Sequence, residues 1–265
     1  AIDRIAQSWE SKFSDGARRA FEYDKREILA KLTKVKNIAL QRKATINWNE
    51  YLNDIEEYLD DAGLEHWREV FIPLMRGVIT DQGKRWAAEL GMEFDIENLF
   101  ARDFWNKYTM KFAIDINQTT KDILANVIDI GQKEGWSIPT IQENIEFSFR
   151  QMAFGDVSPD DLEWYTERMI PYRSELIARD QTLRSSNAGN HELFDSWNLK
   201  TREWLTTIDG RERDSHYEAN GQVRSIDEPF DVGGSQMMFP GDDSLGADLA
   251  EIIQCRCAEI PIIPD

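Results

Sequence analysis

Side chains that can bind a metal or act as nucleophiles are concentrated in the last quarter of the chain. His216 follows Asp214 by two residues, and Cys255 and Cys257 flank Arg256. Imidazole nitrogen and thiolate sulfur are ligands that Zn²⁺ prefers, and a thiolate beside a histidine is also a nucleophile. Three uses are therefore open for these side chains: a zinc site, a Cys–His nucleophile, or polar packing.

The spacing favours polar packing. The two cysteines of a Cys-x-Cys motif are closer in sequence than the usual pair of zinc-binding cysteines. With one histidine nearby, Asp214 or Asp242 would have to supply the fourth zinc ligand. Nothing in the local sequence places Cys257 beside His216. The chain also has no Walker loop, dinucleotide-binding glycine string or zinc-protease pair. We therefore predict no catalytic residue, no metal and no cofactor, with zinc at His216, Cys255 and Cys257 as the alternative.

The segment that must position these residues reads as a series of short elements. We expect a strand over 204–208, a short helix over 211–219, a strand at Val223, a loop over 226–250 and a closing strand over 252–263. Asp-Gly and Asn-Gly pairs mark the turns between the first three elements. A loop of this length in a compact domain is usually functional or poorly ordered.

Most of the remaining sequence has the period of amphipathic helices. Apolar residues recur at steps of three and four, as in Ile2, Ile5, Trp9 and Phe13. Ser137 is expected to cap a helix, and Ser158-Pro159 to begin another. We predict an α+β protein with two parts: a helical bundle or arm over residues 1–157, and a small loop-rich α+β module over residues 158–265.

Charge divides the chain unevenly. The net charge is −18, yet residues 1–43 contain 11 Lys and Arg against 6 Asp and Glu. An acidic body repels phosphates, so general nucleic-acid binding is disfavoured. The basic N-terminal segment is the one candidate for contact with DNA, through Arg18, Arg19, Lys25, Arg26, Lys31, Lys34, Lys36, Arg42 and Lys43.

A series of motifs in the last third of the chain resembles the phage Mu F-like head morphogenesis family. The matching residues are Asp209, Arg211, Asp214, His216, Gly221, Phe230, Pro240, Gly241, Asp242, Cys255, Arg256 and Cys257. The upstream family signature is matched by the run from Ala178 to Thr182, which includes Arg179 and Asp180, and by Asn187. Relatives often carry further cysteines near the histidine and a His-Pro before the last Cys-Arg-Cys, which this chain lacks.

The resemblance implies a minor capsid protein that acts in head morphogenesis. The expected partners are the portal protein and the major capsid or scaffold protein, with DNA as a further partner and no membrane. The expected location is the capsid interior or portal vertex of the virion, and the host cytoplasm during assembly. Within the module, we expect Arg179 to be buried or half-buried and to hold either a carboxylate, such as Asp209 or Asp214, or backbone carbonyls of the following loop.

Two other classes of function stay open at this stage. Related modules occur beside toxin domains, so a metal-dependent or Cys/His enzyme, such as a nuclease, is one alternative. The other is a DNA-binding protein that works through its basic N-terminal segment.

Overall fold

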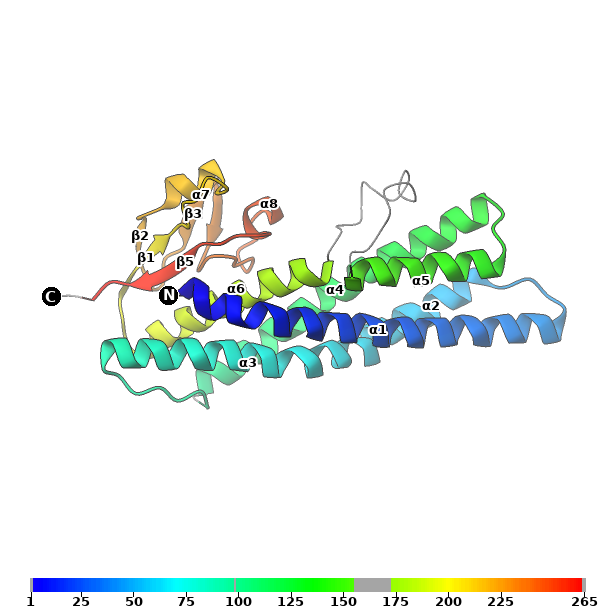
Figure 1. Ribbon diagram of the computed structural model, residues 1–265, viewed down its shortest axis with the longest axis horizontal. Coiled ribbons are helices and arrows are strands. Elements are labelled where there is room, and N and C mark those ends of the chain that lie inside the picture. Colours follow the sequence, from blue (N-terminus) through cyan, green and yellow to red (C-terminus); the bar gives the residue numbers. More distant parts are fainter. Residues whose placement is uncertain (1, 98, 155–172, 264–265) are drawn as a thin grey trace. The chain divides into compact units, whose positions relative to one another are not determined.

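The computed structural model describes residues 2–97, 99–154 and 173–263, and it is an α+β protein (Figure 1). Long helices come first. They are α1 (Ile2–Arg42), α2 (Trp48–Asp60), α3 (Ala62–Leu90), α4 (Leu99–Lys133), α5 (Ile138–Phe154) and α6 (Arg173–Ser196). None of the helices over the described residues carries an apolar stretch long enough to cross a membrane.

The helix ends show why these segments stop where they do. Gly91 and Gly135 adopt φ of 65° and 67° just after α3 and α4, the left-handed conformation that a glycine accepts without strain. Ser137 Oγ accepts a hydrogen bond from the Thr140 backbone N–H at 3.3 Å, which confirms the predicted cap of α5. The helix α1 ends at Arg42 without a glycine, since Lys43, the next residue, itself has a φ of 51°.

The small C-terminal module follows α6. Its elements are β1 (Thr201–Leu205), α7 (Asp214–Ala219), β2 (Val223–Ser225), β3 (Phe230–Val232), β4 (Ser235–Met237), α8 (Leu249–Ile252) and β5 (Ala258–Pro261). The central strand β1 pairs antiparallel with β2 and β5, and Leu205 lies opposite Ala258. In Figure 1, these elements lie side by side.

The prediction of an uninterrupted loop over 226–250 is wrong. Strands β3 and β4 form a hairpin inside it, with Val232 opposite Ser235. The two linking residues, Gly233 and Gly234, have φ of 60° and 82°, as a tight hairpin turn with two left-handed residues requires. Each strand has three residues, too few to show a periodic pattern in the sequence.

The chain forms two compact units. One contains residues 1–13, 73–105 and 176–265, and the other contains residues 14–72 and 106–175. In the first unit, one apolar cluster lies inside the C-terminal module and includes Trp204, Phe230 and both cysteines. A second cluster joins Trp86 and Phe194 to Ile226 and Ala258. The predicted boundary between residues 157 and 158 lies outside the described residues.

Candidate functional site

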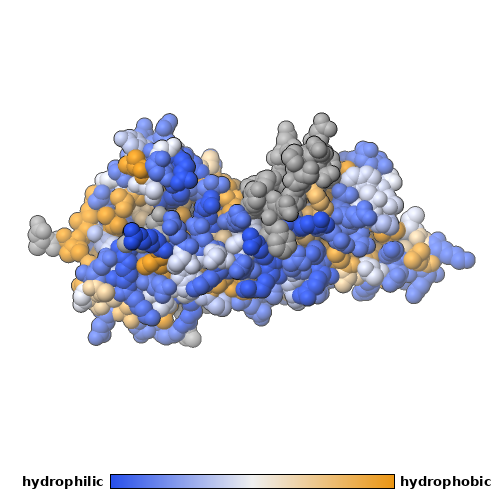
Figure 2. All heavy atoms as spheres, in the orientation of Figure 1, coloured by the Kyte–Doolittle hydropathy of each residue, from blue (hydrophilic) through white to orange (hydrophobic). Residues whose placement is uncertain are grey.

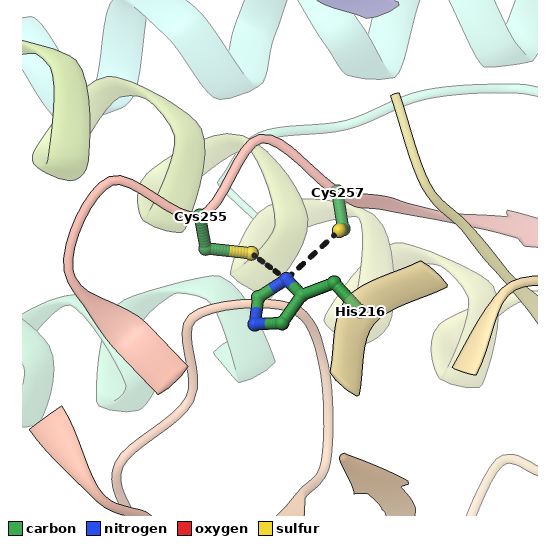
Figure 3. A group of neighbouring side chains, drawn as sticks. All are labelled: His216, Cys255 and Cys257. Atoms are coloured by element: carbon green, nitrogen blue, oxygen red, sulfur yellow. Dashed lines mark hydrogen bonds between the residues drawn. The ribbon is translucent and has the colours of Figure 1, made fainter. Parts of the chain in front are cut away.

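His216, Cys255 and Cys257 meet inside the C-terminal module (Figure 3). His216 Nδ1 lies 3.3 Å from Cys257 Sγ and 3.8 Å from Cys255 Sγ. All three residues are buried, and their ligand atoms lie within 4.8 Å of one another. The polar packing that the sequence predicts for His216 is present, and its partners are the two thiols.

Three local features bring these side chains together. His216 is on α7, which β1 and β2 flank in the sequence. The cysteines lie just before β5, which pairs with β1. Residues two apart in an extended chain point to the same side, and Figure 3 shows both sulfur atoms directed at the imidazole ring. The Cys-x-Cys spacing is thus suited to a single shared partner.

The surroundings of the cluster are polar as well as apolar. His216 Nε2 lies 3.1 Å from a carboxylate oxygen of Glu251, and Ser215 Oγ donates a hydrogen bond to the same oxygen at 2.7 Å. Cys257 Sγ lies 3.6 Å from Thr206 Oγ1, and the Trp204 ring meets the imidazole edge to face at 5.9 Å. Sequence reasoning missed Thr206 and Glu251, because nothing near them in the sequence marks them as partners of His216.

The two thiols differ in acidity. Hydrogen bonds with Cys255, His216 and Thr206 lower the pKa of Cys257 to about 5, although burial acts in the opposite direction. The pKa of Cys255 is raised, because it shares a hydrogen bond with Cys257 and is buried. Of the two thiols, Cys257 is therefore the more readily deprotonated.

Side chains of α6 form hydrogen bonds with the backbone of the segment that precedes β5. Asp180 Oδ1 accepts a hydrogen bond from the Gln254 backbone N–H at 2.8 Å. Asn187 Nδ2 donates to the carbonyl oxygens of Pro240 and Cys257, at 3.2 and 2.9 Å. Two residues of the upstream signature therefore fix the backbone that carries the cysteines.

The expected role of Arg179 is wrong. Arg179 is exposed and makes no hydrogen bond or ion pair with the residues that the structure describes. Asp209 is held instead by both terminal nitrogens of Arg256, at 2.6 and 2.7 Å, and by Arg211. These contacts lower the pKa of Asp209. Arg179 and Asp180 are neighbours on α6, so their side chains point in directions about 100° apart. The side of α6 that faces the module carries Asp180.

Other signature residues close turns or fill the core. Asp242 is buried and accepts hydrogen bonds from Met238 N, Ser244 N and Ser244 Oγ at 2.8–2.9 Å. Gly241 has a φ of 88°, and a Cβ there would lie 2.6 Å from Arg184 Cγ. Gly221 also has a positive φ, of 79°. Phe230 is fully buried, whereas Asp214 is exposed at the first turn of α7.

A buried ion pair, also missed from the sequence, lies elsewhere in the module. Arg202 and Glu259 are both fully buried, and their nearest charged atoms are 3.4 Å apart. Arg202 also donates to the carbonyl oxygens of Ile226 and Glu228 and lies 4.3 Å from the centre of the Phe230 ring. Each residue is in a strand, Arg202 in β1 and Glu259 in β5, and a charged residue in a short strand does not by itself signal burial.

The basic residues of α1 differ in how far they are engaged. Arg18 pairs with Asp15 and Glu175, and Lys25 with Glu22. Arg26 and Lys31 lie over the rings of Tyr23 and Tyr58. Arg19 is exposed. Beyond Lys31, the remaining four basic residues make no ion pair among the described residues; they are Lys34, Lys36, Arg42 and Lys43.

Comparison with known proteins agrees with the motifs. The sequence model of the family described as "Phage Mu protein F like protein" matches residues 121–260. YqbB of Bacillus subtilis (strain 168), described as uncharacterized, is 25% identical over 167 residues, which is 61% of this chain and 47% of YqbB. The chain thus spans about half the length of that relative. No solved structure matches. Since the family match covers more than half of the sequence, the chain belongs to the phage Mu F-like family of head morphogenesis proteins.

Proposed function

We propose that this protein is a minor head protein, incorporated into the procapsid through contacts with the portal, major capsid or scaffold protein. The observation that carries the proposal is the family match over residues 121–260. The helices provide the surface for protein contacts, and the C-terminal module is a stable docking unit. A structural role is consistent with a module whose polar side chains contact one another, as Arg256 contacts Asp209.

Affinity capture during phage assembly tests this role. The full chain carries a tag at one end, and complexes are cross-linked before lysis and identified by mass spectrometry. We expect the portal, major capsid or scaffold protein to be enriched over an untagged control. Capture of the chain without any head protein would contradict the proposal.

A second candidate function, contact with packaged DNA, is supported by the end of α1. Residues 28–49 contain five Lys and Arg and no Asp or Glu. Lys34, Arg42 and Lys43 are exposed there, and so are Ile38 and Leu40. Apolar residues lie among polar ones on the surface around the end of α1 (Figure 2). Lys34, Lys36, Arg42 and Lys43 make no ion pair with a described residue. They are therefore better placed to contact phosphates than the cations earlier in α1, which pair with carboxylates or lie over aromatic rings.

Binding to double-stranded DNA across a range of salt tests the second function. For Z phosphate contacts, the logarithm of the binding constant falls with the logarithm of salt with a slope of about −0.9Z. Replacing Lys34, Lys36, Arg42 and Lys43 with Gln should reduce the slope by up to about 4. The matched control is Arg211→Gln, an exposed cation in the module. Binding that does not depend on salt would count against DNA contact.

A further inference from the structure

The cluster of His216, Cys255 and Cys257 has the dimensions of a zinc site. In a tetrahedral site, Zn–S distances of about 2.3 Å and Zn–N distances of about 2.0–2.1 Å place nitrogen and sulfur about 3.6 Å apart. The two nitrogen-to-sulfur distances here, 3.3 and 3.8 Å, lie on either side of that value. An ion can therefore replace the hydrogen bonds in Figure 3 with small movements of the side chains.

The far side of the imidazole ring gives a second, independent indication. A histidine that binds a metal through one nitrogen usually donates its other N–H to a carboxylate or carbonyl. His216 Nε2 lies 3.1 Å from Glu251 Oε2, although in this structure it makes no hydrogen bond of good geometry with the described residues. A proton on Nε2 would face this carboxylate and leave the Nδ1 lone pair directed at the thiols.

Two other uses of the cluster fit the structure less well. A nucleophilic thiolate must reach a substrate, but Cys257 is only 2% exposed. A Cys–His pair also needs one cysteine, whereas here both thiols face the same nitrogen. A disulfide between the cysteines would leave His216 without its two partners, and both cysteines are free in this structure.

We propose that His216 Nδ1, Cys255 Sγ and Cys257 Sγ bind a structural Zn²⁺ ion, with Glu251 as a positioning residue. The described residues supply three of the four ligands that a tetrahedral zinc site needs. The ion would link α7 to the segment before β5, next to the module's apolar cluster, which includes both cysteines. Such a link suits a module whose apolar cluster has only eight buried residues among those that the structure describes, because metal binding adds directly to the free energy of folding.

Metal content and metal titration of the full chain test this site. The protein is purified with reductant and without chelator, and zinc is measured by elemental analysis. We expect one zinc ion per chain. After removal of the ion, Co²⁺ should bind with the same stoichiometry and give the intense visible absorption of a tetrahedral thiolate site. Chelation should lower the melting temperature, and added Zn²⁺ should restore it.

Variants separate the ligands from the positioning residue. Cys255→Ser and Cys257→Ser should each lose the stoichiometric, thiolate-type Co²⁺ spectrum. Glu251→Gln should still bind one ion but about 10- to 100-fold more weakly. The control His66→Gln removes an imidazole that stacks on Tyr23 in the other unit and should leave the stoichiometry at one. The chelation and titration experiments use the unmodified chain, so they decide the question even if a cysteine variant fails to fold.

Three results would overturn the site. They are a reduced, folded chain that binds less than a tenth of an equivalent of Zn²⁺ and Co²⁺, metal binding that survives the Cys255→Ser/Cys257→Ser double change, and a Cys255–Cys257 disulfide whose reduction does not produce metal binding.

Discussion

The helical unit of residues 14–72 and 106–175 and the C-terminal module are held together in different ways. In the helical unit, aromatic and aliphatic side chains from successive helices form the core. Phe71, for example, is fully buried between the rings of Trp67 and Phe112, with centroids 5.4 and 4.6 Å away. In the module, the apolar cluster is small, and buried polar groups connect segments that are far apart in sequence.

The buried polar groups of the two regions show the same contrast. In the helical unit, the fully buried Asp24 accepts hydrogen bonds from Tyr58 and Trp67, two side chains that also belong to the apolar core. In the module, a buried ion pair joins β1 to β5. Apolar burial therefore stabilises the helical unit, whereas specific polar contacts determine the arrangement of the module.

The largest expected effect comes from removing volume in the helical unit. Phe71→Ala should lower the free energy of unfolding by about 3–5 kcal/mol, because it deletes a buried ring that its neighbours cannot fully replace. Denaturant titration followed by tryptophan fluorescence measures the loss. The control Ile114→Ala, half exposed on α4, should change the free energy by less than about 0.5 kcal/mol. Equal effects would show that the ring does not support the core.

Removing one charge from the module should be nearly as costly. Arg202→Met leaves Glu259 buried without its cation, which should cost about 3–5 kcal/mol in denaturant titration. The double change Arg202→Met/Glu259→Leu should cost less than the single one, since no charge then stays buried. Arg211→Ala, whose side chain is 76% exposed, should cost at most about 1 kcal/mol. If the double change is the more harmful, the ion pair is not what stabilises this sheet.

A medium effect is expected in the loop that follows β4. Asp242→Ala leaves the backbone N–H groups of Met238 and Ser244 without their acceptor, so the free energy of unfolding should fall by about 1–3 kcal/mol. Hydrogen exchange should become faster at these two amides before it does so in the helices. Asp227→Ala removes an exposed carboxylate and serves as the control. Unchanged exchange at both amides would count against the role of Asp242.

The smallest effect concerns pH. Burial raises the pKa of Asp180 from its usual value to about 6, so between about pH 4 and pH 6 the folded chain binds more protons than the unfolded chain. This residue's contribution to stability therefore falls as pH rises through that window. Asp180→Asn keeps the acceptor for Gln254 N and should remove this component of the pH dependence, as seen in melting temperatures from pH 4 to pH 7. If the melting temperature of the variant depended on pH as that of the unmodified chain does, other groups would be responsible for this dependence.

The same contrast explains what the sequence could and could not predict. Helices with long apolar stripes were predictable because their signals are local: the Ser137 cap and the glycines at 91 and 135 mark real helix ends. The closing strand was predicted from its apolar run, and β5 is present within it. The hairpin over 230–237 was missed, because its strands are too short to show periodicity.

The candidate site could be predicted only as a set of residue types. His216 is separated from Cys257 by 41 residues, and their meeting depends on the pairing of β1 with β5. No local pattern contains that register, so the sequence supports or disfavours a zinc site only through the spacing of its residues. Whether Arg179 or Asp180 contacts the module depends in the same way on which side of α6 faces the module.

The measurement that tests the central claim most directly is the amount of this chain in purified phage heads. Heads and procapsids are isolated on density gradients, and the chain is quantified against the major capsid protein by mass spectrometry. The account predicts that the chain is present in both particles, in far fewer copies than the major capsid protein. A chain abundant in infected cells but absent from both particles would contradict it.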